Sequence, residues 1–210
     1  MIVEAFVNGL LLGAGLIIAI GAQNLFVLRQ GMARDQVFIV CLLSSVIDAS
    51  LILAGAIGLG SLIASMPWLV PWASWGGALF LVGFGLLAVY RVIWPKPLGL
   101  SENGAIVSSA RKAVMLTLAF GFLNPHVYLD TVILLGSIAA SYDIDLRLYF
   151  VAGAILASFL WFFSVGYAAR LLSPLLRTKT GARFLDALVA TMMFLVAANL
   201  IWDQVAAIEI

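Results

Sequence analysis

Long apolar runs recur along this chain, and each is long enough to cross a membrane. Short polar stretches separate six of them, at about 5–28, 37–63, 68–93, 113–139, 148–169 and 185–207. A helix rises 1.5 Å per residue, so about 20 apolar residues span about 30 Å of hydrocarbon. The pattern predicts an all-α membrane protein with six transmembrane helices.

The composition agrees with this pattern. Hydrophobic residues make up 64% of the 210 residues and charged residues 10%, against about 25% charged residues in a soluble domain. No loop is long enough for a soluble domain, so we expect one transmembrane domain over 1–210. The first run begins with Glu4 and is too long for a signal peptide, so we interpret it as a retained helix.

The charge and the metal-ligand inventory exclude several classes of function. A net charge of +1 gives no indication of a nucleic-acid partner. With one His and one Cys a zinc site is not expected, because such sites are usually built from three or four His, Cys or carboxylate ligands. We therefore predict no metal and no cofactor, and interpret Cys41 as a small buried apolar side chain.

The basic residues predict the orientation. Ten of the eleven Lys and Arg residues lie in the loops after the first, third and fifth runs, and only Arg147 lies on the other side. Loops rich in Lys and Arg stay cytoplasmic, so both termini are expected outside. The ten residues are Arg29, Arg34, Arg91, Lys96, Arg111, Lys112, Arg170, Arg177, Lys179 and Arg183.

Two segments share a pattern that indicates an internal repeat. IGAQNLFVLRQG (20–31) and FLNPHVYLDTVI (122–133) both place a helix-interrupting pair late in an apolar run, followed by polar residues. Three helices separate the two segments, so the halves 1–93 and 113–210 would cross the membrane in opposite directions. Inverted repeats with interrupted helices are typical of secondary transporters. The alternative is a chance similarity between two hydrophobic helices.

The interruptions carry residues suited to binding an anion. Asn is favoured at the N-cap and Pro at the first helical position, so Asn124 and Pro125 predict a new half-helix inside the bilayer. Its unpaired N–H groups would attract a carboxylate. In the first helix, Gln23 and Asn24 offer further donors. The alternative is a simple proline kink whose polar neighbours satisfy freed backbone groups.

Asp48 is the first of two carboxylates that lie well inside the apolar runs. Ser44 and Ser45 precede it by one turn on the same helical face. Intramembrane carboxylates usually mark substrate or ion pathways. We therefore expect Asp48 in the pathway, lined also by Ser44 and Ser45, and by Ser158 and Trp161 of the fifth run. A structural alternative is that Asp48 pairs with a basic residue of another helix.

Asp130 is the second such group, four residues after His126 and on the same face. Two acids and a half-helix N-terminus fit a zwitterion with an extra positive charge. Asp48 would bind a cationic group, and Asp130 a second cationic group or a proton. The substrate carboxylate would bind Asn124, Gln23 and Asn24. His126, which titrates near neutral pH, is a candidate proton carrier with Asp130 and Asp48.

These residues also resemble a known family. GAQN at 21–24, Asp48 and LNPHVYLD at 123–130, in a chain with six apolar runs, are similar to the LysE family of basic amino-acid exporters, especially its arginine exporter branch. The resemblance implies export of L-lysine or L-arginine from the bacterial cytoplasm across the inner membrane. It implies that Gln23, Asn24, Asp48, Asn124, Pro125, His126 and Asp130 line the path. Many relatives carry Pro where this chain has Ala22.

The sequence therefore predicts an inner-membrane exporter of basic amino acids, working by alternating access with proton exchange. A divalent cation exporter is the alternative, since Asp48 and Asp130 are hard oxygen ligands. An intramembrane enzyme would need an activated nucleophile or a metal set, which the sequence does not offer, so we predict no enzymatic activity. A passive channel would show no counterflow. The oligomeric state stays open, with a homodimer as one alternative.

Overall fold

The structure is a computed structural model that describes residues 1–18, 21–59, 69–94, 109–123, 127–176 and 178–206. Within these ranges all regular structure is helical. Most elements are α-helices, while η1 and η2 are π-helical and η3 is a 3₁₀ turn. The elements are α1 (Ile2–Ile18), α2 (Ala22–Ala33), α3 (Val37–Ala54), η1 (Gly55–Leu59), α5 (Leu69–Ile93), α6 (Ala110–Phe122), η2 (Tyr128–Leu135), α8 (Gly136–Ala140), α9 (Ile144–Ala168), η3 (Ala169–Leu172), α10 (Ser173–Leu176) and α11 (Lys179–Ala206).

Five of the six predicted spans appear as apolar helical segments of membrane-crossing length. Four are continuous, at Val37–Gly58, Ser74–Ile93, Ile144–Leu172 and Lys179–Ala206. The remaining one is the predicted first span, which is a bent pair formed by α1 and α2. The predicted fourth span falls on α6, η2 and α8, and its connection at 124–126 lies outside the described residues. The chain is thus an all-helical, multi-pass membrane protein.

Some helix ends differ from the prediction. The second run was expected to continue to residue 63, but regular α-helix ends at Ala54 and a π-helical turn follows. Gly58 then takes a left-handed conformation (φ 94°), which only glycine adopts readily and which stops the helix. The sixth span begins at Lys179, before the expected 185, because polar residues extend the helix beyond its apolar part.

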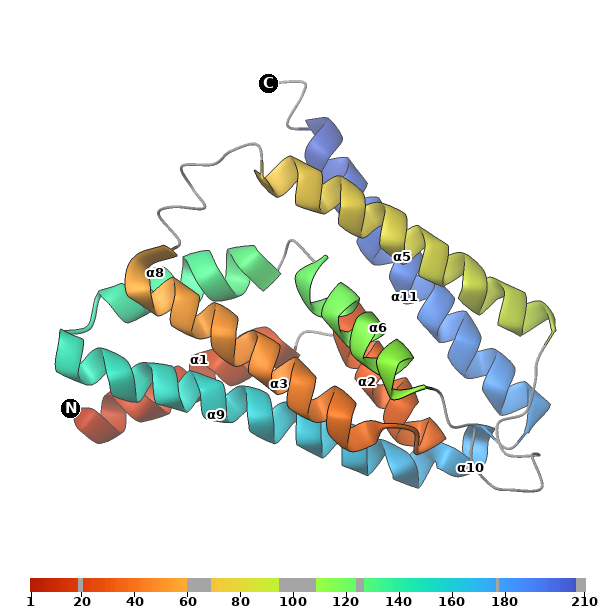
Figure 1. Cartoon of the computed structure of the whole chain (residues 1–210), viewed down its shortest axis with the longest axis horizontal. Coiled ribbons are helices and arrows are strands. Elements are labelled where there is room, and N and C mark those ends of the chain that lie inside the picture. Colours follow the sequence, from red (N-terminus) through yellow and green to blue (C-terminus); the bar gives the residue numbers. More distant parts are fainter. Residues whose placement is uncertain (19–20, 60–68, 95–108, 124–126, 177, 207–210) are drawn as a thin grey trace.

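The helices form two groups joined by the short central helices (Figure 1). α1 and α3 pack against α9, α5 pairs with α11, and α2 and α6 lie between the two groups. α1 and α9 run parallel, since Gly9 faces the backbone of Phe150 and Gly13 faces that of Ala154 four residues later. A Cβ at Gly13 would lie 2.9 Å from the Ala154 Cα, so the helices meet at their backbones.

The outside of the bundle carries large apolar side chains. Trp72, Leu79 and Phe184 are each more than 70% exposed. In a soluble protein such a surface would be unfavourable, but hydrocarbon solvates it well. The buried core between the two groups is built mainly from α2, α5 and α11, and the candidate site lies beside it.

Candidate substrate site

The first span breaks where the sequence places Gly21 and two polar residues. α1 ends at Ile18, α2 begins at Ala22, and the two helices meet at 81°. Gly21 is extended (φ −104°, ψ 176°), the usual conformation of the residue before a first helical turn. The expected interruption is therefore present in this span, with Ala22 and no proline beside the break.

Asn24 holds this bend and links it to the fifth span. Its Nδ2 donates a hydrogen bond to the carbonyl oxygen of Ile17, in the last turn of α1, at 2.7 Å. Its Oδ1 accepts a hydrogen bond from Trp161 Nε1 in α9 at 3.1 Å. The last carbonyl groups of a helix have no partner within it, and Asn24 satisfies one that the break exposes. The side chain therefore positions the two halves of the span.

Asp48 lies in the middle of α3 and is 6% exposed. Its Oδ2 accepts a hydrogen bond from the Ser158 hydroxyl of α9 at 3.4 Å. Within the described part of the chain Asp48 forms no ion pair; the carboxylates that do are Glu4 and Asp186. The structural alternative of a buried Asp48–Arg or Asp48–Lys pair thus finds no support there.

Asp48 and Asp130 face one cavity. The cavity has a volume of about 390 Å³ and lies at the break of the first span, between α3, η2, α9 and α11. Asp130 reaches it from η2, four residues beyond segment 124–126, which lies outside the described residues. The lining residues are Leu16, Ile17, Gly21, Gln23, Asn24, Asp48, Val127, Asp130, Thr131, Phe162, Leu195, Val196 and Asn199.

The lining gives this cavity a negative, mostly apolar character. Its two ionisable lining residues are both carboxylic acids, and the described lining contains no Lys, Arg or His. A cavity of a few hundred Å³ with few polar groups has the usual dimensions of a small-ligand site. Such a cavity favours a small organic cation over an anion.

Gln23 adds a donor to the same cavity. The residue is 7% exposed, and its Nε2 is buried without a hydrogen-bond partner among the described residues. Buried donors in native proteins nearly always have an acceptor, so Gln23 Nε2 is suited to an oxygen supplied by a ligand. A carboxylate would provide it.

The structure places the predicted site residues in three groups. Gln23, Asn24, Asp48 and Asp130 line the cavity together. Ser158 and Trp161 stand behind them, bonded to Asp48 and Asn24. Ser44 and Ser45 are fully buried beside Asp48, outside the described lining, and Ser45 bonds the Cys41 carbonyl at 2.9 Å. Asn124, Pro125 and His126 lie outside the described residues.

Two polar lining residues were missed from the sequence. Thr131 follows Asp130 in η2, and Asn199 lies in the C-terminal half of α11. Both were treated as ordinary members of apolar runs. Asn199 carried a usable signal, because an amide in the middle of a membrane span is unfavourable unless it meets a polar partner or a cavity.

Comparison with known proteins identifies the family. The family described as LysE type translocator matches residues 14–204. The chain belongs to this family. The resemblance seen in the sequence is thus confirmed, and the protein is a transporter and not an enzyme.

Several curated relatives of this LysE member match over nearly their whole length. Proteins named "Arginine exporter protein ArgO" from Shigella flexneri and from Escherichia coli K12 are each 36% identical over 201 residues, which cover 96% of this chain and 95% of theirs. The protein of the same name from Enterobacter sp. strain 638 is 37% identical over 195 residues, 93% of this chain and 92% of its own. No solved structure matches the chain with significance.

Proposed function

We propose that this protein exports basic amino acids, arginine foremost and also lysine, from the cytoplasm across the bacterial inner membrane. The observation that carries the proposal is that Asp48 and Asp130 line one cavity at the break of the first span. The arginine exporters named above are similar over almost the whole chain. Both point to a substrate with at least one positive charge more than a neutral amino acid.

The two carboxylates suit the two cationic groups of such a substrate. Asp48 is held by Ser158, so its position in the cavity is fixed. Asp130 reaches the same space from another helix. A carboxylate in a low-dielectric site binds a guanidinium or ammonium group far more strongly than it does in water. We assign the side-chain cation to Asp48, and the second cation or a proton to Asp130.

The substrate carboxylate is assigned to the first and fourth spans. Gln23 Nε2, buried and without an acceptor among the described residues, is the donor from the first span. Asn124 and Pro125, which precede the helical segment that carries Asp130, complete the proposed anion subsite through the N–H groups of a helix start. Asn24 acts here by fixing the bend that presents Gln23.

Alternating access is supported by a symmetry among helix contacts. In the proposed inverted repeat, spans one, two and three correspond to spans four, five and six, with halves at 1–93 and 113–210. Exchanging the two halves turns the contact between spans one and five (α1–α9) into that between spans four and two (α6–α3). The contacts between spans two and five (α3–α9) and between spans three and six (α5–α11) each map onto themselves. These helix pairs thus map onto one another under the exchange, as an inverted repeat predicts.

Close backbone contacts follow the same symmetry. Gly31 of α2 meets Gly166 of α9, and Gly136 of α8 meets Gly55 at the end of the second span. The first pair joins the end of span one to the end of span five, and the second pair joins the end of span four to the end of span two. Asp48 and Ser158 lie seven and eight residues before Gly55 and Gly166, at nearly corresponding positions of spans two and five, and they are hydrogen-bonded to each other.

Orientation and coupling follow from charge. The basic residues in the loops support a topology with both termini outside, because loops rich in Lys and Arg stay cytoplasmic. Export of a cation against a potential negative inside costs about 2.3 kcal/mol per charge per 100 mV. Proton exchange would offset this cost, with His126, Asp130 and Asp48 as carriers. Unchanged transport with no pH gradient and a clamped potential would contradict the coupling.

Counterflow tests the proposed function. Proteoliposomes loaded with unlabelled arginine are expected to accumulate external labelled arginine, and external lysine is expected to compete. Citrulline has nearly the shape of arginine but no side-chain charge, so it should compete poorly if Asp48 reads the charge. Asp48→Asn should lower counterflow at least about 30-fold, while Asp143→Asn, at an exposed position before α9, should leave it unchanged.

The alternative of a divalent cation exporter is examined in the same vesicles. Ca²⁺ prefers six to eight oxygen ligands, whereas no group of three or more His, Cys, Asp or Glu that could hold a metal occurs within the described residues. Mg²⁺, Mn²⁺ and Ca²⁺ are therefore not expected to compete with arginine. Competition by these ions, with no arginine counterflow, would support the alternative instead.

A further inference from the structure

An ion cluster joins three spans beside the candidate site. Asp186, near the start of α11, is 7% exposed. Its Oδ1 lies 3.1 Å from an Nη2 of Arg29 in α2 and 3.0 Å from Nε of Arg91 in α5. One carboxylate oxygen therefore holds two guanidinium groups from different helices. The ion cluster could not be predicted from the sequence, because all three residues adjoin loops rich in basic residues.

A layer of aromatic rings separates this cluster from the cavity. Phe26 of α2 stacks on Phe120 of α6 with ring centroids 4.9 Å apart, and Phe80 and Phe84 of α5 meet the same ring edge-on, each at 4.9 Å. Arg91 lies over the Phe84 ring, 5.6 Å from its centroid. The aromatic layer and the ion cluster are thus in direct contact.

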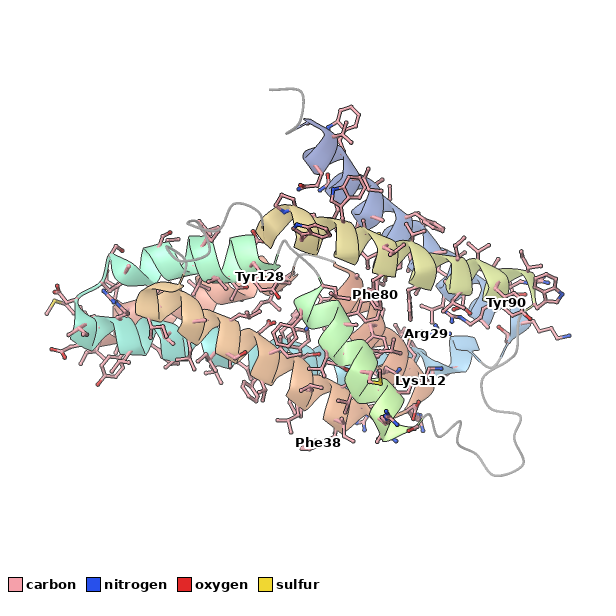
Figure 2. The ribbon with its side chains drawn as sticks, turned by 45° about the horizontal axis from the view of Figure 1, so that its top comes forward. Arg29, Phe38, Phe80, Tyr90, Lys112 and Tyr128 are labelled. Carbon is pink, nitrogen blue, oxygen red and sulfur yellow. The ribbon has the colours of Figure 1, made fainter. Side chains whose placement is uncertain are left out.

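The order along the helices shows how these layers are stacked. In α2 the cavity residues Gln23 and Asn24 come first and Phe26 follows. Arg29 lies five residues after Asn24, about 7.5 Å further along the helix axis. In α11 Asp186 lies well before the cavity residues at 195–199. Figure 2 shows the same order in space: Phe80 appears between Tyr128 of η2 and Arg29, and Lys112 appears on the far side of Arg29 from Phe80.

We infer that Arg29, Asp186 and Arg91 form a latch that closes the cytoplasmic end of the substrate cavity and must open for loading. The latch joins the second half of the interrupted first span to the α5–α11 pair, so separating these elements breaks both ion pairs. While it is closed, the cluster has one excess positive charge, which repels a cationic substrate at the cytoplasmic end. This inference rests on the proposed transport function and names its inner gate.

The cluster is incompletely bonded, which suits a part that opens. Nη2 of Arg91 is buried and has no acceptor within the described residues. The two guanidinium groups also repel each other across a single oxygen. Burying ions is unfavourable unless their geometry and hydrogen bonding are excellent. A permanent structural ion cluster would be expected to satisfy its donors, whereas a gate has to remain close in free energy to its open state.

The latch is tested by chemical access to the cavity and not by transport. Cys41 is the only cysteine, so Cys41→Ala gives a cysteine-free background and Thr131→Cys adds one reporter in the cavity. A membrane-impermeant maleimide is applied to the cytoplasmic face of inside-out vesicles. Asp186→Asn should accelerate labelling at least about tenfold, because the inward-open population rises. Arg29→Gln should act in the same direction.

Two matched variants complete the test. Arg183→Gln removes an exposed charge three residues from Asp186 on the same helix and should leave the rate unchanged. The exchange Arg29→Asp with Asp186→Arg restores opposite charges and should return labelling to the slow parental rate. Equal rates in the parent, Asp186→Asn and Arg29→Gln would overturn the latch, as would acceleration only from the outer face. Loss of arginine counterflow in the parent would contradict the proposed function without affecting this result.

Discussion

The indole N–H of Trp161 in α9 donates a hydrogen bond to the side-chain oxygen of Asn24 in α2, at 3.1 Å. The same amide bonds the carbonyl of Ile17 across the break. A residue of the second half of the chain therefore fixes the bend in the first span, which presents Gln23 to the cavity. The site is thus assembled from both halves, as a midplane transporter site requires.

Trp161→Phe tests this relationship. The phenyl ring keeps most of the packing but cannot donate, and a typical hydrogen bond contributes about 1 kcal/mol. We expect kcat/KM for arginine counterflow to fall about fivefold. Trp202→Phe, at an exposed position of α11, is the control and should behave as the parent. Equal kinetics of both variants would show that the bond does not position the site.

Removing the Asp48 charge should separate function from stability. Asp48→Asn removes a buried carboxylate that pairs with no described cation, so we expect an unchanged or higher thermal unfolding temperature in detergent. Loss of the charge that binds the substrate cation should lower kcat/KM at least about 30-fold, the equivalent of about 2 kcal/mol. A large loss of thermal stability together with activity would instead indicate a structural role.

Gln23→Leu should weaken binding of the substrate carboxylate and leave binding of the side-chain cation unchanged. The change removes the buried Nε2 donor and keeps a similar volume, so the substrate carboxylate loses a partner worth about 1.5 to 3 kcal/mol. The apparent KM for arginine should rise at least about tenfold. Agmatine, which is arginine without its carboxylate, should compete with labelled arginine equally well in parent and variant. Equal weakening of both ligands would place Gln23 elsewhere.

Gly31→Val should destabilise the bundle. A Cβ at Gly31 would overlap the backbone oxygen of Gly166, so α2 and α9 would have to separate. Overpacking of this kind costs about 1 to 3 kcal/mol. The thermal unfolding temperature in detergent should fall by several degrees. Gly83→Val, at an exposed position with open space around its Cβ, is the control and should leave it unchanged.

Ionisable and helix-breaking residues made the core of the site predictable. Asp48 and Asp130 stand out because a charge in an apolar run is costly, and both face the cavity. The break at Gly21 was also visible, since glycine and two polar residues interrupt a hydrophobic run. Thr131 was not, because a threonine is common in membrane helices and its position depends on the tertiary packing.

Asp186 shows the limit of local patterns. It follows a basic loop, so a solvated carboxylate is the simplest interpretation from the sequence alone. Its burial arises only because α2 and α5 bring Arg29 and Arg91 to the same place from distant parts of the chain. The π-helical turns at Gly55–Leu59 and Tyr128–Leu135 likewise depend on how helices pack and carry no clear sequence signal.

The connection between α2 and α3 consists of only three residues, and two of them, Arg34 and Gln36, are left-handed (φ 55° and 49°). So short a turn extends to at most about 14 Å between helix ends and has little slack. Tilting of α2 would therefore drag the adjoining end of α3. A displacement of α2 at Arg29 would therefore also shift α3, the helix that carries Asp48. The short connection would couple the ion cluster to the cavity through backbone movement alone.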